Sequence, residues 1–186
     1  EEQGYHEYIS LFPELAAMPG KRPRPTREVA TLAAGCFWGV EDILRKLPGV
    51  IDTEVGYTGG DMEDPTYDDI ASGESGHAEA VRVVFDPSRL SYESLIEYFF
   101  RLHDPTTYDR QGNDVGTQYR SVVFVHDEEQ RVAAQKVKER VDRSGKWREP
   151  VVTEIMGVTT FYPAEDYHQD YLVKYPHGYT CHYLRN

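Results

Sequence analysis

The sequence predicts an α/β (α+β) fold, a two-layer sandwich in which helices pack on one sheet. Strand-like runs of alternating apolar residues and helix-like runs with apolar residues every three or four positions follow one another along the chain. Two long polar stretches, 61–77 and 105–118, interrupt this alternation. The chain has 186 residues, 39% hydrophobic and 28% charged, which is typical of one globular domain. We therefore expect an N-terminal extension over residues 1–27 and a single domain over 28–186.

The first strand and helix are the clearest elements. Residues 28–35, EVATLAAG, predict a strand. Helical spacing of Val40, Ile43, Leu44 and Leu47 follows, and the Pro-Gly pair at 48–49 ends that helix. Further strands are expected over 50–60, 78–87 and 119–127, and over 150–163 as a strand or a hairpin. Further helices are expected over 91–104, 128–143 and 164–176, with a short one near 2–15, and residues 177–186 form an irregular tail.

Charge and cysteine content exclude several classes of function. A net charge of −12 argues against nucleic acid or an anionic membrane as the main partner. No run of 18 apolar residues occurs, and the two cysteines form neither a disulfide framework nor a zinc-ligand spacing. We expect a cytoplasmic protein, or an exported one if a signal peptide preceded the first residue.

Cys36 lies where the first strand gives way to a helix, followed by Phe37 and Trp38. At a helix start, unpaired N–H groups and the helix dipole lower a thiol's pKa from ~8.5 and favour the thiolate. A buried structural cysteine would fit the same place. The two aromatic rings could form an apolar wall for a ligand, or belong to the core.

Glu79 shares the alternating face of its strand with Val81, Val83 and Phe85. A carboxylate on a buried strand face is costly, and burial raises its pKa until it can donate a proton at neutral pH. A place at the strand end, with the carboxylate in water, is the alternative.

The two polar loops and the tail hold further candidates. Tyr67 lies in the first loop, Asp114 in the second, and Tyr119 where the second loop enters its strand. Each could equally be a surface or packing residue. Cys181, 145 positions after Cys36, suits either a structural role or a resolving thiol that attacks an oxidised cysteine.

Seven blocks of residues, in order along the chain, resemble one family, the A-type peptide methionine sulfoxide reductases. They are GCFWG at 35–39, GYTGG at 56–60, PTY at 65–67, GHAEAV at 76–81, HDPTT at 103–107, RQGNDVGTQYRS at 110–121 and YHQDYL at 167–172. The resemblance implies reduction of the S-epimer of methionine sulfoxide, free or in proteins, with thioredoxin as the final reductant. It implies no metal or organic cofactor, and a sandwich built on a ferredoxin-like βαβ core. We expect a monomer that protects proteins against oxidative damage.

The resemblance also implies roles for single residues. Cys36 matches the nucleophile that becomes a sulfenic acid, and Glu79 matches the acid that protonates the sulfoxide oxygen. Tyr67 and Tyr119 match phenols that hydrogen-bond that oxygen. Asp114 matches a polar residue that supports the site. Phe37 and Trp38 match the apolar pocket that holds the substrate methyl group.

The tail departs from the family pattern. Many members end in a Gly-rich tail with GYCG, whereas this chain has GYTCHYLRN, so that Cys181 is shifted by one residue. We expect Cys181 to resolve the Cys36 sulfenic acid to a disulfide. Two rivals are a cysteine hydrolase with His77 or His182 as the base, and a module that binds methionyl peptides without turnover.

Overall fold

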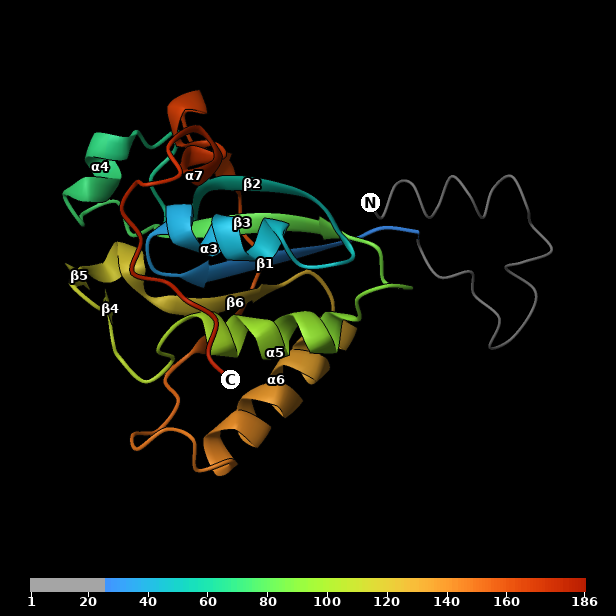
Figure 1. The fold of residues 1–186 in the computed structure, drawn as a ribbon. Helices are drawn as coiled ribbons and strands as arrows, with labels where there is room; N and C mark the ends of the chain where they lie inside the picture. The colour runs from blue at the N-terminus through green and yellow to red at the C-terminus, as the bar shows by residue number, and fades with distance from the viewer. Residues whose placement is uncertain (1–25) are drawn as a thin grey trace.

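The protein is built on a mixed six-stranded sheet, which the computed structural model describes over residues 26–186 (Figure 1). The helix expected near 2–15 lies outside the described residues. The strands are ordered β7-β6-β1-β3-β2-β8, and all neighbours are antiparallel except β6 and β7. Their bounds are β1 Glu28–Ala34, β2 Val50–Thr58, β3 Ala78–Phe85, β6 Ser121–Val125, β7 Glu154–Gly157 and β8 Tyr162–Pro163.

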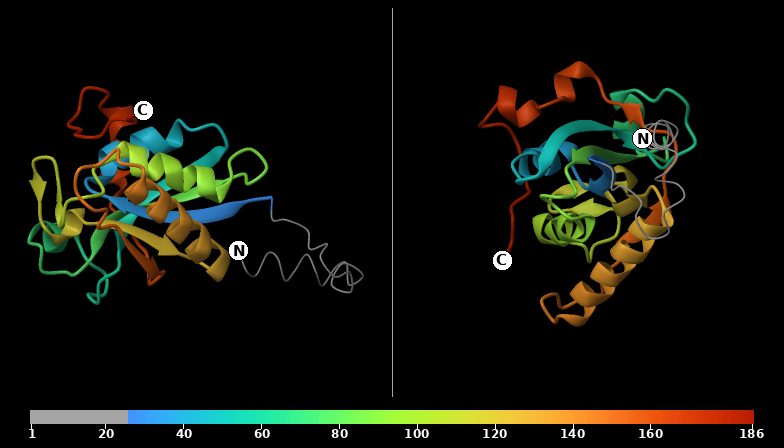
Figure 2. Two further views of the ribbon diagram at one scale, coloured as in Figure 1. Left: turned by 90° about the horizontal axis from the view of Figure 1, so that it is seen from below. Right: turned by 90° about the vertical axis from the view of Figure 1, so that its right-hand side faces the viewer.

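Three helices cover one face of the sheet. They are α3 (Phe37–Arg45), α5 (Tyr92–Leu102) and α6 (Glu128–Arg143), and α5 and α6 lie side by side in both further views (Figure 2). The start of α5 is fixed by Ser91, whose hydroxyl accepts a hydrogen bond from the Ser94 N–H. Its apolar stripe then enters the main core together with Leu44 of α3 and Val83 of β3.

The order of elements β1-α3-β2-β3-α5-β6 is a βαββαβ unit. Its four strands lie in the order β6-β1-β3-β2, so that β1 and β2 are parallel with β3 between them. This confirms the predicted two-layer sandwich on a ferredoxin-like core. Both β1 and β3 lie in the middle of the sheet. Because they are antiparallel, the C-terminal end of β1 lies next to the N-terminal end of β3.

The two polar loops contain structure that the sequence did not predict. The first includes α4 (Tyr67–Ala71), which starts with a reciprocal capping box between Thr66 and Asp69. The second forms a small hairpin of β4 (Arg110–Gln111) and β5 (Asp114–Val115), followed by a 3₁₀ turn, η1, over Thr117–Tyr119. Both loops therefore hold their side chains in defined places.

The segment 150–163 is not a hairpin. Its first strand, β7, pairs with β6 at one edge of the sheet, and its second, β8, pairs with β2 at the opposite edge. The helix expected over 164–176 is also interrupted. A 3₁₀ turn, η2 (Asp166–His168), and α7 (Tyr171–Lys174) are separated at Asp170, whose φ of 51° is left-handed.

A side chain completes the β2 edge beyond β8. The Gln169 amide accepts a hydrogen bond from the Val55 N–H at 2.9 Å and donates one to the Val55 carbonyl at 2.9 Å. Gln169 therefore pairs with the backbone of β2 as another strand would.

The C-terminal tail is irregular, as predicted, but it is packed against the domain. It runs from α7 past the start of α3 to the end of α5 (Figure 1). A Cβ atom at Gly39 would lie 2.6 Å from the His182 ring, so this glycine lets the tail approach α3. At the far end the Arg185 N–H donates to the Arg101 carbonyl at 2.9 Å, which caps α5.

Within residues 26–186, no helix has the length and apolar content needed to cross a membrane. The same residues contain no group of three or more His, Cys, Asp or Glu side chains arranged to hold a metal ion.

Candidate active site

Cys36 occupies the turn between the central strand β1 and helix α3. Gly35 makes this turn with a φ of 96°, and Cys36 is the N-cap residue of the helix. A side chain at Gly35 could not be accommodated, because its Cβ would lie 2.7 Å from the Gln111 side chain. The predicted position of the thiol at a helix start is therefore present in the fold.

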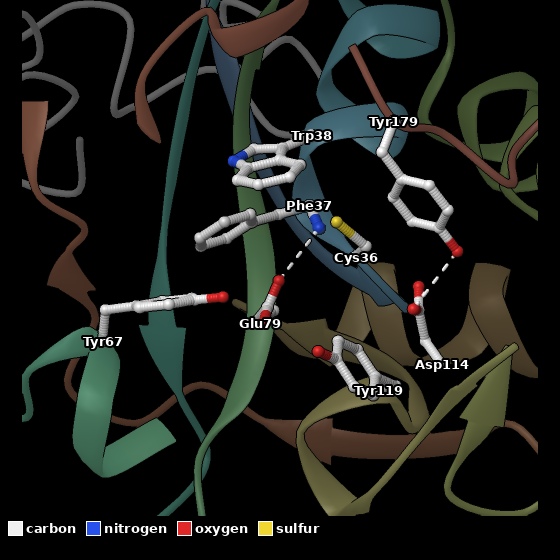
Figure 3. Close-up of a pocket in the computed structure, with 8 residues that line it drawn as sticks. All are labelled: Cys36, Phe37, Trp38, Tyr67, Glu79, Asp114, Tyr119 and Tyr179. Carbon is white, nitrogen blue, oxygen red and sulfur yellow. Dashed lines mark hydrogen bonds between the residues drawn. The ribbon is translucent and has the colours of Figure 1, made fainter. Parts of the chain in front are cut away.

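The thiol opens into a cavity of about 200 Å³ (Figure 3). The cavity brings together side chains from the β1–α3 turn, α3, α4, β3, the β4–β5 hairpin, η1 and the tail. Its lining residues are Cys36, Phe37, Trp38, Tyr67, Glu79, Asp114, Tyr119 and Tyr179. Seven of these eight residues were predicted from the sequence, and the eighth is Tyr179. Cys181 was also predicted as a site residue, but it lies outside the lining.

Glu79 is a buried carboxyl on the core face of β3, only 3% exposed. Its Oε1 accepts a hydrogen bond from the Phe37 N–H at 3.2 Å, which joins β3 to the start of α3 (Figure 3). Burial raises the pKa of Glu79 to about 8, against the opposing effect of the Phe37 hydrogen bond. The carboxyl is therefore mostly protonated at neutral pH, and the alternative of a solvated strand end is wrong.

The Cys36 thiol differs from the expectation in one respect. Burial raises its pKa well above the ordinary value, and the nearby Glu79 carboxyl raises it further, while the Trp38 N–H lowers it. The helix start does favour the thiolate, but desolvation outweighs it. Since protonation of Glu79 removes a negative charge beside the sulfur, acid and nucleophile are electrostatically coupled.

Two phenols project into the same cavity as Glu79. Tyr67 is the first residue of α4, where its N–H donates to Glu165 at 3.2 Å, and Tyr119 ends η1. Burial, and then the charge of Glu79, raise the pKa of both phenols. Both hydroxyls therefore stay protonated and can donate hydrogen bonds to an oxygen bound in the cavity.

Phe37 and Trp38 form the apolar part of the cavity. Trp38 is held by a stack on Tyr171, with ring centroids 3.8 Å apart and planes at 11°. Its indole N–H donates to Nδ1 of His168 at 3.0 Å. Phe37 is 1% exposed and also belongs to the main core, so both interpretations of this ring hold.

The comparisons with known proteins agree with this chemistry. The family model described as peptide methionine sulfoxide reductase matches residues 28–186. The chain belongs to this family. It is 55% identical over 156 residues to the peptide methionine sulfoxide reductase MsrA of Nocardia farcinica, covering 84% of this chain and 89% of that one.

Solved structures share the fold of this reductase. The reduced form of Mxr1 from Saccharomyces cerevisiae has a TM-score of 0.82 and 40% identity, covering 87% of this chain and 93% of that one. The same protein in complex with Trx2 has a TM-score of 0.59 and 28% identity, covering 90% and 97%. As a member of the family, the protein is an oxidoreductase that acts on methionine sulfoxide.

Sequence reasoning missed Tyr179 in the reductase site. Its hydroxyl donates to Oδ1 of Asp114 at 3.2 Å, and its ring closes one side of the cavity (Figure 3). The Sγ atom of Cys181 lies 3.8 Å from Oδ2 of the same Asp114. The GYT triplet next to Cys181 was the available signal, because a tyrosine two residues before the cysteine expected to reach Cys36 would also come close to the site.

Replacing Trp38 by alanine should weaken use of methionine sulfoxide by removing apolar contact with the substrate methyl group. One such contact surface contributes ~1–3 kcal/mol to discrimination. We expect a lower kcat/KM per folded molecule in the reductase assay, together with some loss of thermal melting temperature, because the stack on Tyr171 and the bond to His168 are removed. A large loss of melting temperature with unchanged kinetics per folded molecule would instead make Trp38 a core residue.

Proposed function

We propose that this enzyme reduces the S-epimer of methionine sulfoxide, free or in proteins, in two chemical steps followed by thioredoxin recycling. Cys36 attacks the sulfoxide sulfur as its S–H bond breaks, and Glu79 delivers a proton to the sulfoxide oxygen; the proton lost by the Cys36 thiol restores the Glu79 carboxyl. The oxygen passes to Cys36 as its bond to the substrate sulfur breaks. Methionine leaves, and Cys36 is left as a sulfenic acid.

One observation carries this proposal: a buried carboxyl, whose pKa is raised by burial to about 8, faces the same small cavity as a cysteine thiol. A sulfoxide oxygen gains negative charge as its sulfur is attacked, and an acid with a pKa near the working pH is suited to neutralise that charge. Tyr67 and Tyr119 add two further donors. The methyl group would lie against Phe37 and Trp38, which fixes the handedness of the bound sulfoxide.

In the second step Cys181 attacks Cys36. The Cys181 sulfur gives an electron pair to the Cys36 sulfur, the S–O bond breaks, and water leaves with the thiol proton. The disulfide is then reduced by a thioredoxin-type dithiol, one sulfur at a time. The complex of a solved relative with Trx2 supports a partner of this kind. Both cysteines are free in the present structure.

The two rival functions have less support. A cysteine hydrolase needs a histidine base beside its nucleophile. His77 uses its ring to accept from the Gly60 N–H at 3.0 Å and to donate to the Met62 carbonyl at 2.7 Å. Neither His77 nor His182 lines the cavity. A binding module without turnover would have no need of a proton donor beside a thiol.

The proposal is tested by coupling the enzyme to thioredoxin, thioredoxin reductase and NADPH with a racemic methionine sulfoxide peptide. A stereospecific reductase consumes NADPH equal to half of the sulfoxide and then stops. Complete consumption would contradict the epimer assignment, and none at all would favour the binder or the hydrolase.

Replacing Cys181 by serine should separate the two steps. The first turnover should remain, with one methionine released per enzyme and a Cys36 sulfenic acid that dimedone can trap. Steady-state turnover with thioredoxin should fall sharply, and dithiothreitol should restore it because a small thiol can enter the cavity. Normal thioredoxin turnover of this variant would mean that Cys36 is reduced directly.

A further inference from the structure

The residue after the resolving cysteine, His182, is buried in the tail and has no part in the mechanism so far. Its side chain is 8% exposed, and its Nε2 lies 2.6 Å from the Ala34 carbonyl oxygen at the end of β1. A Cβ atom at Gly35 would lie 3.3 Å from the same Nε2. The imidazole is therefore next to the turn that carries Cys36.

The hydrogen bond to Ala34 fixes the tautomer of the ring. A carbonyl oxygen can only accept, so Nε2 carries the hydrogen and donates it. Burial lowers the pKa of His182, which keeps the ring neutral at neutral pH. Nδ1 therefore has a free lone pair and is a base.

That lone pair faces the resolving thiol. The Sγ atom of Cys181 lies 3.8 Å from Nδ1 of His182, 3.8 Å from Oδ2 of Asp114 and 3.9 Å from the Gln111 carbonyl oxygen. A backbone carbonyl cannot take a proton in this range of pH, and an aspartate is a much weaker base than an imidazole. Among the three acceptors, the imidazole is best matched to a thiol.

We propose that His182 is the general base of the recycling step, taking the proton of Cys181 through Nδ1 as this thiol attacks the Cys36 sulfenic acid. The Cys181 S–H bond breaks, the new S–S bond forms, and the S–O bond of Cys36 breaks. The imidazolium then returns the proton to the departing oxygen, so that water leaves and His182 is neutral again. One thiol and one sulfenic acid give one disulfide and one water, so the atoms balance and no further oxidant is needed.

The surroundings of His182 keep the ring neutral at rest but contain two groups that stabilise a transient imidazolium. Burial and the charge of Arg185 in the tail lower the pKa of the ring, while the Ala34 carbonyl and the charge of Asp114 on β5 oppose them. His103, at the end of α5, is buried and has its pKa lowered to about 3, so it adds no charge at neutral pH. Asp114 thus favours the protonated ring without competing for the proton.

The inference rests on the proposed role of Cys181 and is tested by replacing His182 with glutamine. The glutamine amide can keep the hydrogen bond to Ala34, but it offers no base. Mixed with one equivalent of substrate, the variant should release methionine at the wild-type rate, while disulfide formation at pH 7 slows by roughly 10²–10⁴-fold. Thr180→Val, which removes the hydroxyl that accepts from the His182 N–H at 3.1 Å, is the control for a loosened tail.

The pH profile distinguishes a base from a structural residue. Disulfide formation in the wild type should be flat between pH 7 and 8, whereas in His182→Gln it should rise about tenfold per pH unit with the thiolate fraction. Equal rates and equal profiles in the two proteins would overturn the role of His182. A wild type that forms no disulfide would instead overturn the role of Cys181, which separates the two failures.

A second measurement covers the case in which His182→Gln stops the first step. In a Cys36→Ser background, alkylation of Cys181 by iodoacetamide needs no substrate chemistry. The proton transfer to Nδ1 should make Cys181 reactive at pH 7, and His182→Gln should lose this reactivity. Identical alkylation profiles with and without His182 would overturn the proposal.

Discussion

Cys36→Ser is expected to abolish reduction of methionine sulfoxide, even with excess dithiothreitol. A serine hydroxyl at neutral pH is a far poorer nucleophile than a cysteine sulfur. The small change in volume fits the buried turn, so the fold should be kept. The measurement is methionine released in a single turnover, before any recycling step can limit the rate.

Cys181→Ser is the matched control for this substitution, because it makes the same chemical change 145 positions away and should leave the first turnover intact. More than a trace of methionine from Cys36→Ser would exclude Cys36 as the attacking group. The reaction would then need another nucleophile, and within the cavity lining no second cysteine is present.

Glu79→Gln is expected to lower the rate of the first step by roughly 10²–10⁴-fold, the contribution of a general acid. Glutamine can still accept the hydrogen bond from the Phe37 N–H, so the start of α3 should keep its position. It cannot deliver a proton to the sulfoxide oxygen. The rate is measured as methionine released in a single turnover, together with the thermal melting temperature.

Glu41→Gln provides the control for replacing a buried carboxyl. Glu41 is 1% exposed, and burial raises its pKa as well. It lies outside the cavity, where its carboxylate accepts hydrogen bonds from the Thr53 hydroxyl and the Asp170 N–H. A glutamine can bond to both groups, so this variant should reduce substrate at the wild-type rate. Equal rates for Glu79→Gln and the wild type would transfer the acid role to Tyr67 or Tyr119.

Most of the fold could be predicted because the information is local. The strand at 28–34 and the helix at 92–102 show their periods in a few consecutive residues, and the structure has both. The hairpin alternative for 150–163 was wrong because β7 and β8 each pair with a strand distant in sequence. No local pattern states which edge of a sheet a short strand will join.

The site residues, too, could be predicted only where a local pattern shows them. Glu79 could be identified from its strand face alone, because a carboxyl among core residues is visible in the alternation. The raised pKa of the Cys36 thiol could not, since it depends on burial and on the Glu79 carboxyl, 43 positions away. Tyr179 and the base beside Cys181 depend on where an irregular tail packs, which only the assembled domain determines.

The pairing of Gln169 with Val55 has a consequence for the proteins that this enzyme repairs. Oxidised clients are often partly unfolded and expose strands that can add to any open sheet edge. At Val55 the edge is closed, because the Gln169 amide and the Ala164 N–H occupy the Val55 peptide groups. A client strand therefore finds no free peptide group at Val55 and cannot extend the sheet at this point of the β2 edge.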